Sequence, residues 1–260
     1  MNRTTKKTVF KKPEKAYKNL DFLNSRDARA LRILAEYLHP KAQFLSQGLQ
    51  NTIVVFGSAR APALEDVEQI KAANPKDPRL KLTSYYEQTV ELTNRLTQWS
   101  LDLDAKEQPF VVCTGAGPGV MMAANRGAHE AGGKNAGLGI SLPNESVVNP
   151  YVTPELHFEF HYFFTRKFWF SYFAKALIIM PGGFGTLDEL FEVLTLIQTK
   201  KIKRKLPIVL FGKEFWNKLI NFETLVEFGT ISPEDLNLVH LSDQVEDAFQ
   251  FITSKLKTEL

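Results

Sequence analysis

Three glycine-rich segments of the sequence have the composition of phosphate-binding turns. Gly57-Ser58 ends an apolar run, residues 115–119 read Gly-Ala-Gly-Pro-Gly, and residues 182–186 read Gly-Gly-Phe-Gly-Thr. A glycine turn that opens a helix leaves backbone N–H groups unpaired at the positive end of the helix dipole, where a phosphate can bind. Any one of them alone could instead be a tight turn without a ligand. The candidate phosphate-binding residues are Gly57, Ser58, Gly115, Gly117, Gly119, Gly182, Gly183, Gly185 and Thr186.

The spacing of the glycines narrows the kind of phosphate ligand. No glycine turn is followed by Lys-Ser or Lys-Thr, so the Walker A pattern is absent and ATP hydrolysis is disfavoured. The three glycines of residues 115–119 do not have the G-x-G-x-x-G spacing of dinucleotide sites, and no acidic residue ends a strand about 20 residues later. A mononucleotide therefore fits these turns better than a dinucleotide.

Thr186 and Glu189 have two interpretations that the sequence leaves open. As a helix N-cap and its N3 residue they would form a capping box, whose role is to fix the helix start. On a helical projection, however, Glu189 lies opposite Leu187 and Leu190, and the segment 185–199 is apolar around most of its circumference. Such a helix is expected to be buried, where carboxylates are rare unless they are paired or functional.

Arg166 and Lys167 stand inside an unusually aromatic segment, residues 157–176. A cation in such surroundings needs an anion or an aromatic face as its partner. The guanidinium of arginine offers a two-pronged donor for phosphate or carboxylate. The alternative is a structural role, as a cation–π contact or as an ion pair with Glu155 or Glu159. The aromatic side chains are expected to be mainly core.

The elements that position these residues alternate between apolar runs and amphipathic segments. Because the predicted strands are continuous apolar runs, they indicate a parallel sheet covered on both faces. We therefore predict an α/β fold, a doubly wound parallel sheet that is Rossmann-like, with an N-terminal helical extension. In such sheets ligands bind outside the carboxyl ends of the strands, so the three glycine turns should meet at one edge. Strands are predicted near 51–56, 110–114, 136–143, 176–181, 207–211 and 236–241. Helices are predicted over 24–38, 82–99, 185–199, 213–222 and 243–256, and one more follows the glycine turn at 115–119 and ends at Gly132. Residues 61–80 are predicted to be irregular.

Length and composition favour one large domain with an appended segment. We divide the 260 residues into a basic flexible arm (1–20), a helical extension (21–48) and a nucleotide-binding catalytic domain (49–260). No stretch approaches the roughly 18 apolar residues of a membrane span. The single cysteine, Cys113, lies in a predicted core strand and fits a reducing, cytoplasmic location. The five histidines lack metal-ligand spacing, so no metal site is expected.

Taken together, the motifs resemble the LONELY GUY (LOG) family, often labelled lysine decarboxylase-like. The segment from Pro181 to Glu189 matches the family signature PGGxGTxxE, and Arg166-Lys167 stands where the family has its RK pair. Gly57-Ser58 and the turn at 115–121 fit the other two family loops, so the resemblance covers residues 50–222. The segments 143–145 and 194–201 look like the longer bacterial subgroup.

The resemblance implies an enzyme that hydrolyses a nucleoside 5′-monophosphate, AMP or a cytokinin riboside 5′-monophosphate, to free base and ribose 5-phosphate. It implies a homodimer without a cofactor, with Arg166 and Glu189 as catalytic residues. Lys167 and the 182–186 turn with Thr186 would hold the substrate. Two departures put substrate preference in doubt: the second loop reads Thr114-Gly115-Ala116-Gly117, where short members have a glycine run, and about fifty residues precede the first strand.

Two other functions compete with hydrolysis. A non-catalytic carrier of a nucleotide or of molybdenum cofactor would share the fold and the glycine loop, but the presence of both Arg166 and Glu189 favours an enzyme. The basic arm could contact DNA, although a net charge of +3 is weak evidence and nucleic acid is not the expected partner. A decarboxylase is unsupported, because nothing in the sequence resembles a pyridoxal-phosphate apparatus.

Overall fold

The computed structural model describes residues 12–103, 108–143 and 148–257. The arm predicted over 1–20 therefore lies outside the described residues as far as Lys11, and so do Asn144 and Glu145 of the segment 143–145. The described chain forms a seven-stranded sheet in the order β4-β3-β2-β1-β5-β6-β7, and all neighbouring strands are parallel. The strands are β1 (Thr52–Phe56), β2 (Val111–Thr114), β3 (Asn135–Ile140), β4 (His157–Phe160), β5 (Ala174–Ile179), β6 (Ile208–Phe211) and β7 (His240–Ser242).

The first strand lies at the centre of the sheet. The chain builds outward from β1 through β2 to β4, and then returns to place β5 on the other side of β1. Phe56 at the end of β1 is in register with Ile179 at the end of β5, so both strands finish at the same level. The strand order reverses between these two strands, which is where a doubly wound sheet binds ligands. The predicted fold class is confirmed.

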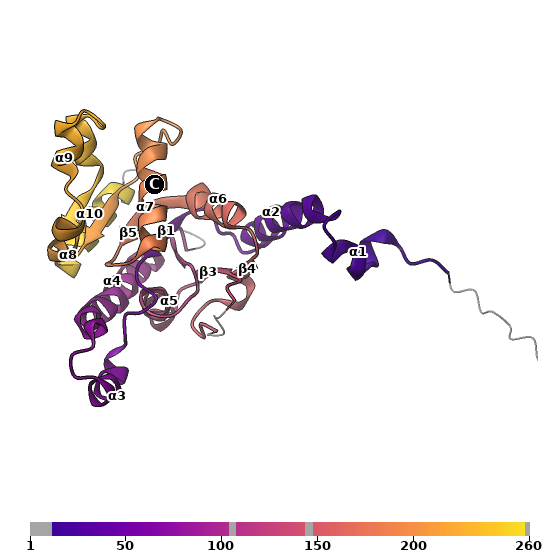
Figure 1. Ribbon diagram of the computed structural model, residues 1–260, viewed down its shortest axis with the longest axis horizontal. Helices are drawn as coiled ribbons and strands as arrows, with labels where there is room; N and C mark the ends of the chain where they lie inside the picture. Colours follow the sequence, from indigo (N-terminus) through magenta and orange to yellow (C-terminus); the bar gives the residue numbers. More distant parts are fainter. Residues whose placement is uncertain (1–11, 104–107, 144–147, 258–260) are drawn as a thin grey trace, which may run out of the picture.

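Alternate side chains of the buried strands feed two separate cores. Val54 and Phe56 belong to one core and Ile53 and Val55 to the other, as expected from the two-residue period of a strand. The first core packs under helices α2 (Arg29–Ser46), α6 (Phe163–Phe173), α7 (Phe184–Gln198) and α8 (Lys213–Leu219), and the second under α4 (Thr83–Leu101), α5 (Val120–Glu130) and α10 (Val245–Leu256). Figure 1 shows α6 and α7 on one side of the strands and α4 and α5 on the other.

The N-terminal extension is helical, but its main helix is longer than predicted. A short helix α1 (Leu20–Asn24) precedes α2, which begins at Arg29 rather than 24 and runs past the predicted end at 38 to Ser46. Pro40 lies inside α2 and has no N–H for the carbonyl oxygen of Glu36. The indole Nε1 of Trp169 donates to that oxygen instead, at 3.1 Å. In Figure 1, α1 lies at the far end of α2 from the sheet.

Other local predictions need correction. The aromatic segment forms helix α6, although its apolar residues have no helical period that would reveal it. Residues 61–80, predicted to be irregular, contain helix α3 (Val67–Ala73), and the helix predicted over 213–222 ends at Leu219 before α9 (Phe222–Glu227) begins. The last strand starts at His240 rather than 236. Within the described residues, no helix is long and apolar enough to cross a membrane.

Candidate active site

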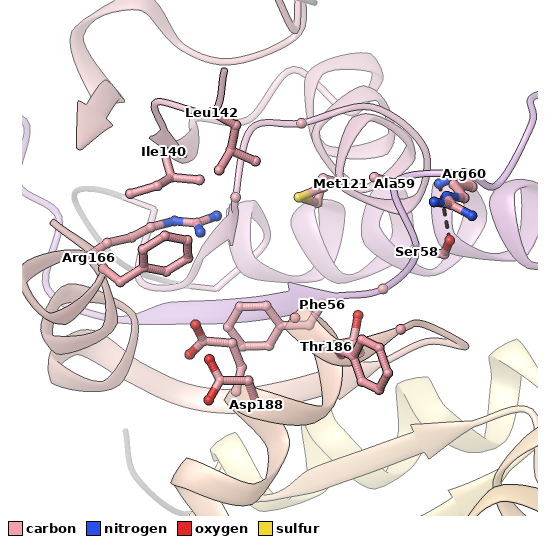
Figure 2. A pocket seen from close by; sticks show the side chains of 18 residues that line it. Phe56, Ser58, Ala59, Arg60, Met121, Ile140, Leu142, Arg166, Thr186 and Asp188 are labelled. Carbon is pink, nitrogen blue, oxygen red and sulfur yellow. Dashed lines mark hydrogen bonds between the residues drawn. The ribbon is translucent and has the colours of Figure 1, made fainter. Parts of the chain in front are cut away.

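The three glycine turns meet at the carboxyl edge of the sheet and form the walls of one cleft of about 690 Å³. The turn after β1 and the turn after β2 contribute Gly57, Ser58, Gly115 and Gly117. Figure 2 shows Arg166 and Asp188 on opposite walls toward one end of the cleft, and Ser58 and Arg60 toward the other. The other lining residues are Phe56, Ala59, Met121, Ile140, Leu142, Phe163, Gly183, Phe184, Gly185, Thr186 and Glu189.

The backbone of Ser58 connects the three turns. Its N–H donates to the carbonyl oxygen of Pro181 at 3.0 Å, and its own carbonyl accepts from the N–H of Val120 at 3.0 Å, where α5 begins. The turns after β1 and β2 lie so close together that each of them needs a glycine at the contact. A Cβ atom at Gly57 would meet the side chain of Val120, and one at Gly119, where φ is +66°, would overlap the carbonyl of Ser58. These glycines therefore hold the turns together.

The second turn is supported by a buried polar network. The hydroxyl of Thr114 donates to the side-chain oxygen of Asn125 at 2.6 Å and accepts from the N–H of Ala116 at 3.0 Å. The amide of Asn149 also donates to that oxygen of Asn125, at 3.0 Å. Ala116 has a φ of +59°, a left-handed conformation that costs a non-glycine residue about 1 kcal/mol or more. The network holds the strained turn in place.

Helix α7 begins earlier than the capping box predicted. Gly183 is the N-cap, Thr186 is the third residue of the helix, and no side chain caps the start. The capping-box interpretation of Thr186 and Glu189 was therefore wrong. A Cβ atom at Gly182 would overlap the side chain of Thr186. At Gly183 and Gly185 a Cβ atom would have no described atom within 4 Å apart from its chain neighbours and the backbone of α7 itself. Packing of the described residues does not require glycine at those last two positions.

Arg166 projects into the cleft from the first turn of α6. Its Nε donates to the carbonyl oxygen of Leu138 at 2.7 Å, and its guanidinium carbon lies 5.1 Å from the centre of the Phe170 ring. A Cβ atom at Gly115 would overlap its Nη2. Of the two structural interpretations, the cation–π contact is present. Glu159 instead accepts a hydrogen bond from Ser141 at 2.9 Å.

Glu189 is a buried carboxylate on the wall of the cleft. Its side chain lies on the sheet-facing side of α7, and the residue is 7% exposed. Burial raises the pKa of Glu189 to about 7, while the positive charges of Lys167 and Arg166 oppose that rise. Among the described residues no side chain or backbone group donates a hydrogen bond to this carboxylate. A carboxylate in this condition is a functional-site candidate.

Lys167 lies beside helix α7 and not on the wall of the cleft. Its ammonium group contacts Asp188 at 2.8 Å and Glu192 at 2.7 Å. These pairs raise the pKa of Lys167 against the opposing effect of its burial. The lysine thus joins α6 to α7 and adds positive potential at Glu189. Gly119 and Gly182 likewise shape the turns without lining the cleft.

Several lining residues were not foreseen. Arg60 lies two residues after Ser58, on the rim of the cleft, and its nearness to the Gly57-Ser58 turn was a signal that could have identified it. One wall of the cleft is apolar and consists of Ile140, Leu142 and Phe163. No sequence motif predicted this wall. The described residues contain no cluster of three or more His, Cys, Asp or Glu side chains arranged to hold a metal ion. Cys113 is buried in β2, and burial raises the pKa of its thiol to about 12.

The arrangement combines four kinds of group in one cleft. The N-terminus of α7 presents backbone donors suited to an anion, and Ser58 adds its hydroxyl. The buried Glu189 can stabilise a developing positive charge or accept a proton from water. Arg166 supplies a fixed cation opposite α7, and the apolar wall suits an uncharged ring. The cleft can therefore hold an anionic molecule with an apolar end and act on the atoms between them.

The sequence is similar to one described family and to several named proteins. The family model described as "Possible lysine decarboxylase" matches residues 121–252. Cytokinin riboside 5′-monophosphate phosphoribohydrolase LOG7 of Arabidopsis thaliana is 30% identical over 196 residues, which cover 68% of this chain and 82% of that protein. The cytokinin riboside 5′-monophosphate phosphoribohydrolase of Rhodococcoides fascians is 28% identical over 58% of this chain and 76% of its own length.

Solved structures also share the architecture. The Moco carrier protein from Chlamydomonas reinhardtii superposes with a TM-score of 0.51 at 21% sequence identity, over 80% of this chain and 99% of its own. At that identity the likeness concerns the fold alone.

Proposed function

Because the chain belongs to the LOG family, we propose that it hydrolyses the N-glycosidic bond of a nucleoside 5′-monophosphate. The model of this family carries the description "Possible lysine decarboxylase". The substrate is AMP or a cytokinin riboside 5′-monophosphate, and the products are free base and ribose 5-phosphate. The proposal is supported by the names of the related proteins and by the buried Glu189, which accepts no hydrogen bond from the described residues and lines the same cleft as Arg166.

The 5′-phosphate would bind at the start of α7. The first N–H groups of a helix have no partners within the helix and lie at its positive end. Gly183 and Gly185 leave the backbone there accessible, since, apart from their chain neighbours and the backbone of α7 itself, no described atom lies within 4 Å of either Cβ position. The hydroxyls of Thr186 and Ser58 and the guanidinium of Arg60 can add hydrogen bonds and positive charge.

The ribose would then lie over Glu189, which follows Thr186 by three residues on α7. Breaking the C1′–N bond leaves positive charge on the sugar, as in glycoside hydrolysis, while the bond electrons and a proton go to the base. A water oxygen bonds to C1′ and loses its proton. The ionised carboxylate of Glu189 can stabilise the cationic sugar and accept the proton from water.

Arg166 would hold the nucleotide and favour departure of the base. Its guanidinium is fixed by the carbonyl of Leu138 and the ring of Phe170, so little reorganisation is needed on binding. The base would extend toward the apolar wall of Ile140, Leu142 and Phe163. A pyridoxal-phosphate decarboxylase is not favoured, since the described lining of the cleft includes no lysine to form a Schiff base.

The proposal is tested by incubating the pure protein with AMP, GMP, CMP, UMP and isopentenyladenosine monophosphate, followed by chromatography of the free base. We expect base and ribose 5-phosphate in equal amounts from at least one nucleotide. Arg166→Ala and Glu189→Ala should each remove turnover without unfolding the protein. Tight nucleotide binding with no turnover would instead support the carrier.

We also propose that the protein forms a homodimer through α6 and α7. Six large aromatic side chains are exposed on these helices, and Phe184 is 92% exposed. A contiguous apolar surface of this kind is typical of a protein interface. Tyr172→Glu should yield monomers in light scattering, whereas Phe228→Glu, at a more exposed aromatic residue just after α9, should not. The exposed aromatic residues of α6 and α7 are Phe163, Phe164, Phe168, Tyr172, Phe184 and Phe191, of which Phe163 and Phe184 also line the cleft.

The division of the chain into an arm, an extension and a catalytic domain stays a prediction, and so does its cytoplasmic location. The buried, unreactive thiol of Cys113 is consistent with a reducing compartment.

A further inference from the structure

Helix α6, which carries Arg166, is capped by a side chain from the N-terminal extension. Its own N-cap residue, Tyr162, makes no side-chain capping hydrogen bond. The carboxylate of Glu36, on α2, accepts from the N–H of His161 at 2.8 Å and from that of Tyr162 at 3.3 Å. The hydroxyl of Thr165 donates to the same carboxylate at 2.5 Å. A negative charge at a helix N-terminus satisfies orphan donors and complements the helix dipole.

A second contact fixes how α2 sits along α6. Because Pro40 has no N–H, the carbonyl oxygen of Glu36 has no donor within its own helix. Trp169, one turn beyond Arg166, donates its indole N–H to that oxygen at 3.1 Å. Tyr37 stacks on the Trp169 ring with centres 5.5 Å apart. One residue of the extension, Glu36, thus binds α6 at two successive turns through both its backbone and its side chain.

Arg166 lies between these two contacts. Thr165, which contacts Glu36, directly precedes Arg166 in the chain. The backbone N–H of Arg166 makes the first hydrogen bond of the helix, to the carbonyl oxygen of Tyr162 at 3.3 Å. The guanidinium has little freedom, since it is bounded by Gly115, Leu138 and Phe170. A shift of the first turn of α6 would therefore move the guanidinium out of this niche or force its side chain into another conformer.

We propose that Glu36 is a positioning residue for Arg166, by which the N-terminal extension sets the geometry of the nucleotide site. Glu36 does not touch the cleft, because it is absent from the described residues that line it. It acts through the first turn of α6. The inference rests on the proposed function for its effect on nucleotides, while its effect on the Arg166 side chain can be measured without any ligand.

The ligand-free test observes the side-chain Nε–H of Arg166 by ¹H–¹⁵N NMR, with the signal assigned by its loss in Arg166→Ala. Because this N–H is bonded to Leu138, it should give a sharp, slowly exchanging signal in the native protein. Glu36→Gln should shift or broaden it, and Thr165→Val should do the same, while Thr165→Ser keeps the hydroxyl and the signal. Glu68→Gln, the same change at an exposed carboxylate of α3, is the control. An unchanged Arg166 signal in a folded Glu36→Gln protein would overturn the proposal.

The functional test measures AMP binding by calorimetry in a Glu189→Gln background, so that the nucleotide is not consumed. We expect Glu36→Gln to weaken AMP binding roughly tenfold or more when Arg166 is present, because small misplacements of a binding group are costly. When Arg166 is already alanine, the same change should alter binding less than about twofold, since the two effects are coupled. Equal losses in both backgrounds would mean a general structural role and would refute the inference.

The two proposals fail in different ways. A wild-type protein that releases no base from any nucleotide refutes the hydrolase, whatever the NMR signal of Arg166 does. A wild-type protein that hydrolyses nucleotides, with an Arg166 signal and turnover unaffected by Glu36→Gln, refutes only the positioning role.

Discussion

Gly115 and Arg166 fit together so closely that a Cβ atom on the glycine would overlap Nη2 of the arginine. The two residues come from different elements, the turn after β2 and the first turn of α6. Gly115 has no positive φ, so the backbone conformation alone does not demand glycine. Glycine is required because a Cβ atom would overlap the guanidinium of Arg166 and the Sδ atom of Met121. Both side chains line the cleft, so this glycine belongs to the site and not only to the turn.

Gly115→Ala is therefore expected to impair activity more than folding. The added methyl group must displace the guanidinium of Arg166 and the Sδ atom of Met121. If Arg166 acts in catalysis as proposed, its misplacement should cost about a hundredfold in rate. The free energy of unfolding should change by less than about 2 kcal/mol, because the end of a flexible side chain can move aside. Steady-state kinetics and urea unfolding measure the two effects. A variant with full activity would mean that Arg166 does not need its observed position.

Glu189→Gln should stabilise the protein at high pH. The pKa of Glu189 is raised from its ordinary value of 4.5 to about 7 by burial. Between these values the unfolded chain loses its proton first, so this group's contribution to stability falls as pH rises from 4.5 to 7. Glutamine removes the effect. The variant's advantage in unfolding free energy should grow by about 3 kcal/mol between pH 4.5 and pH 8.

The measurement is chemical unfolding of both proteins at pH 4.5, 6 and 8. A difference that does not vary with pH would show that Glu189 ionises normally in the folded protein.

Removing the charge of Lys167 should shift the activity profile to higher pH. If ionised Glu189 is the catalytic form, kcat/KM rises with pH through about 7 and then levels off. The ammonium of Lys167 lowers the pKa of Glu189, so Lys167→Gln lets that pKa rise further and moves the rising limb in the alkaline direction. Lys218→Gln, which breaks an exposed ion pair with Glu214, is the matched control. A limb that stays in place would remove Lys167 from the electrostatics of the site.

Gly185→Ala should separate stability from binding. Gly185 is the second residue of α7, and apart from its chain neighbours and the helix backbone no described atom lies within 4 Å of a Cβ there. Alanine in place of a helical glycine stabilises by about 0.5–1 kcal/mol. If the phosphate binds against this backbone, the same methyl group should raise KM for AMP roughly tenfold or more. Thermal unfolding and initial rates test both halves, and an unchanged KM would place the phosphate elsewhere.

The sequence was sufficient for the sheet and for the meeting of the three glycine turns. Continuous apolar runs such as residues 52–56 and 174–179 are typical of strands buried on both faces, and parallel order brings the turns together. Helix α6 could not be found in this way, because Phe163, Phe164 and Phe168 are exposed aromatic residues beside buried ones and give no amphipathic period. The aromatic side chains are thus only in part core.

Contacts between segments that are distant in the sequence could not be predicted from local sequence patterns. The capping box at Thr186 and Glu189 had the right residues, yet the helix begins at Phe184 and the carboxylate turns toward the cleft. The true cap of α6 comes from Glu36, 125 residues before His161, and nothing near either residue announces the contact. Only the tertiary structure decides which carboxylate caps which helix.

The two backbone hydrogen bonds of Ser58 have a consequence for how a nucleotide would enter the cleft. Since they tie the start of α5 and the end of β5 to one residue, neither wall can swing outward alone without breaking a bond to the central turn. The cleft is thus preorganised before any ligand binds. The conformational entropy lost in ordering its walls is lost on folding and not on nucleotide binding. We expect association in a single kinetic phase whose rate rises linearly with nucleotide concentration, without the plateau that a closing step imposes.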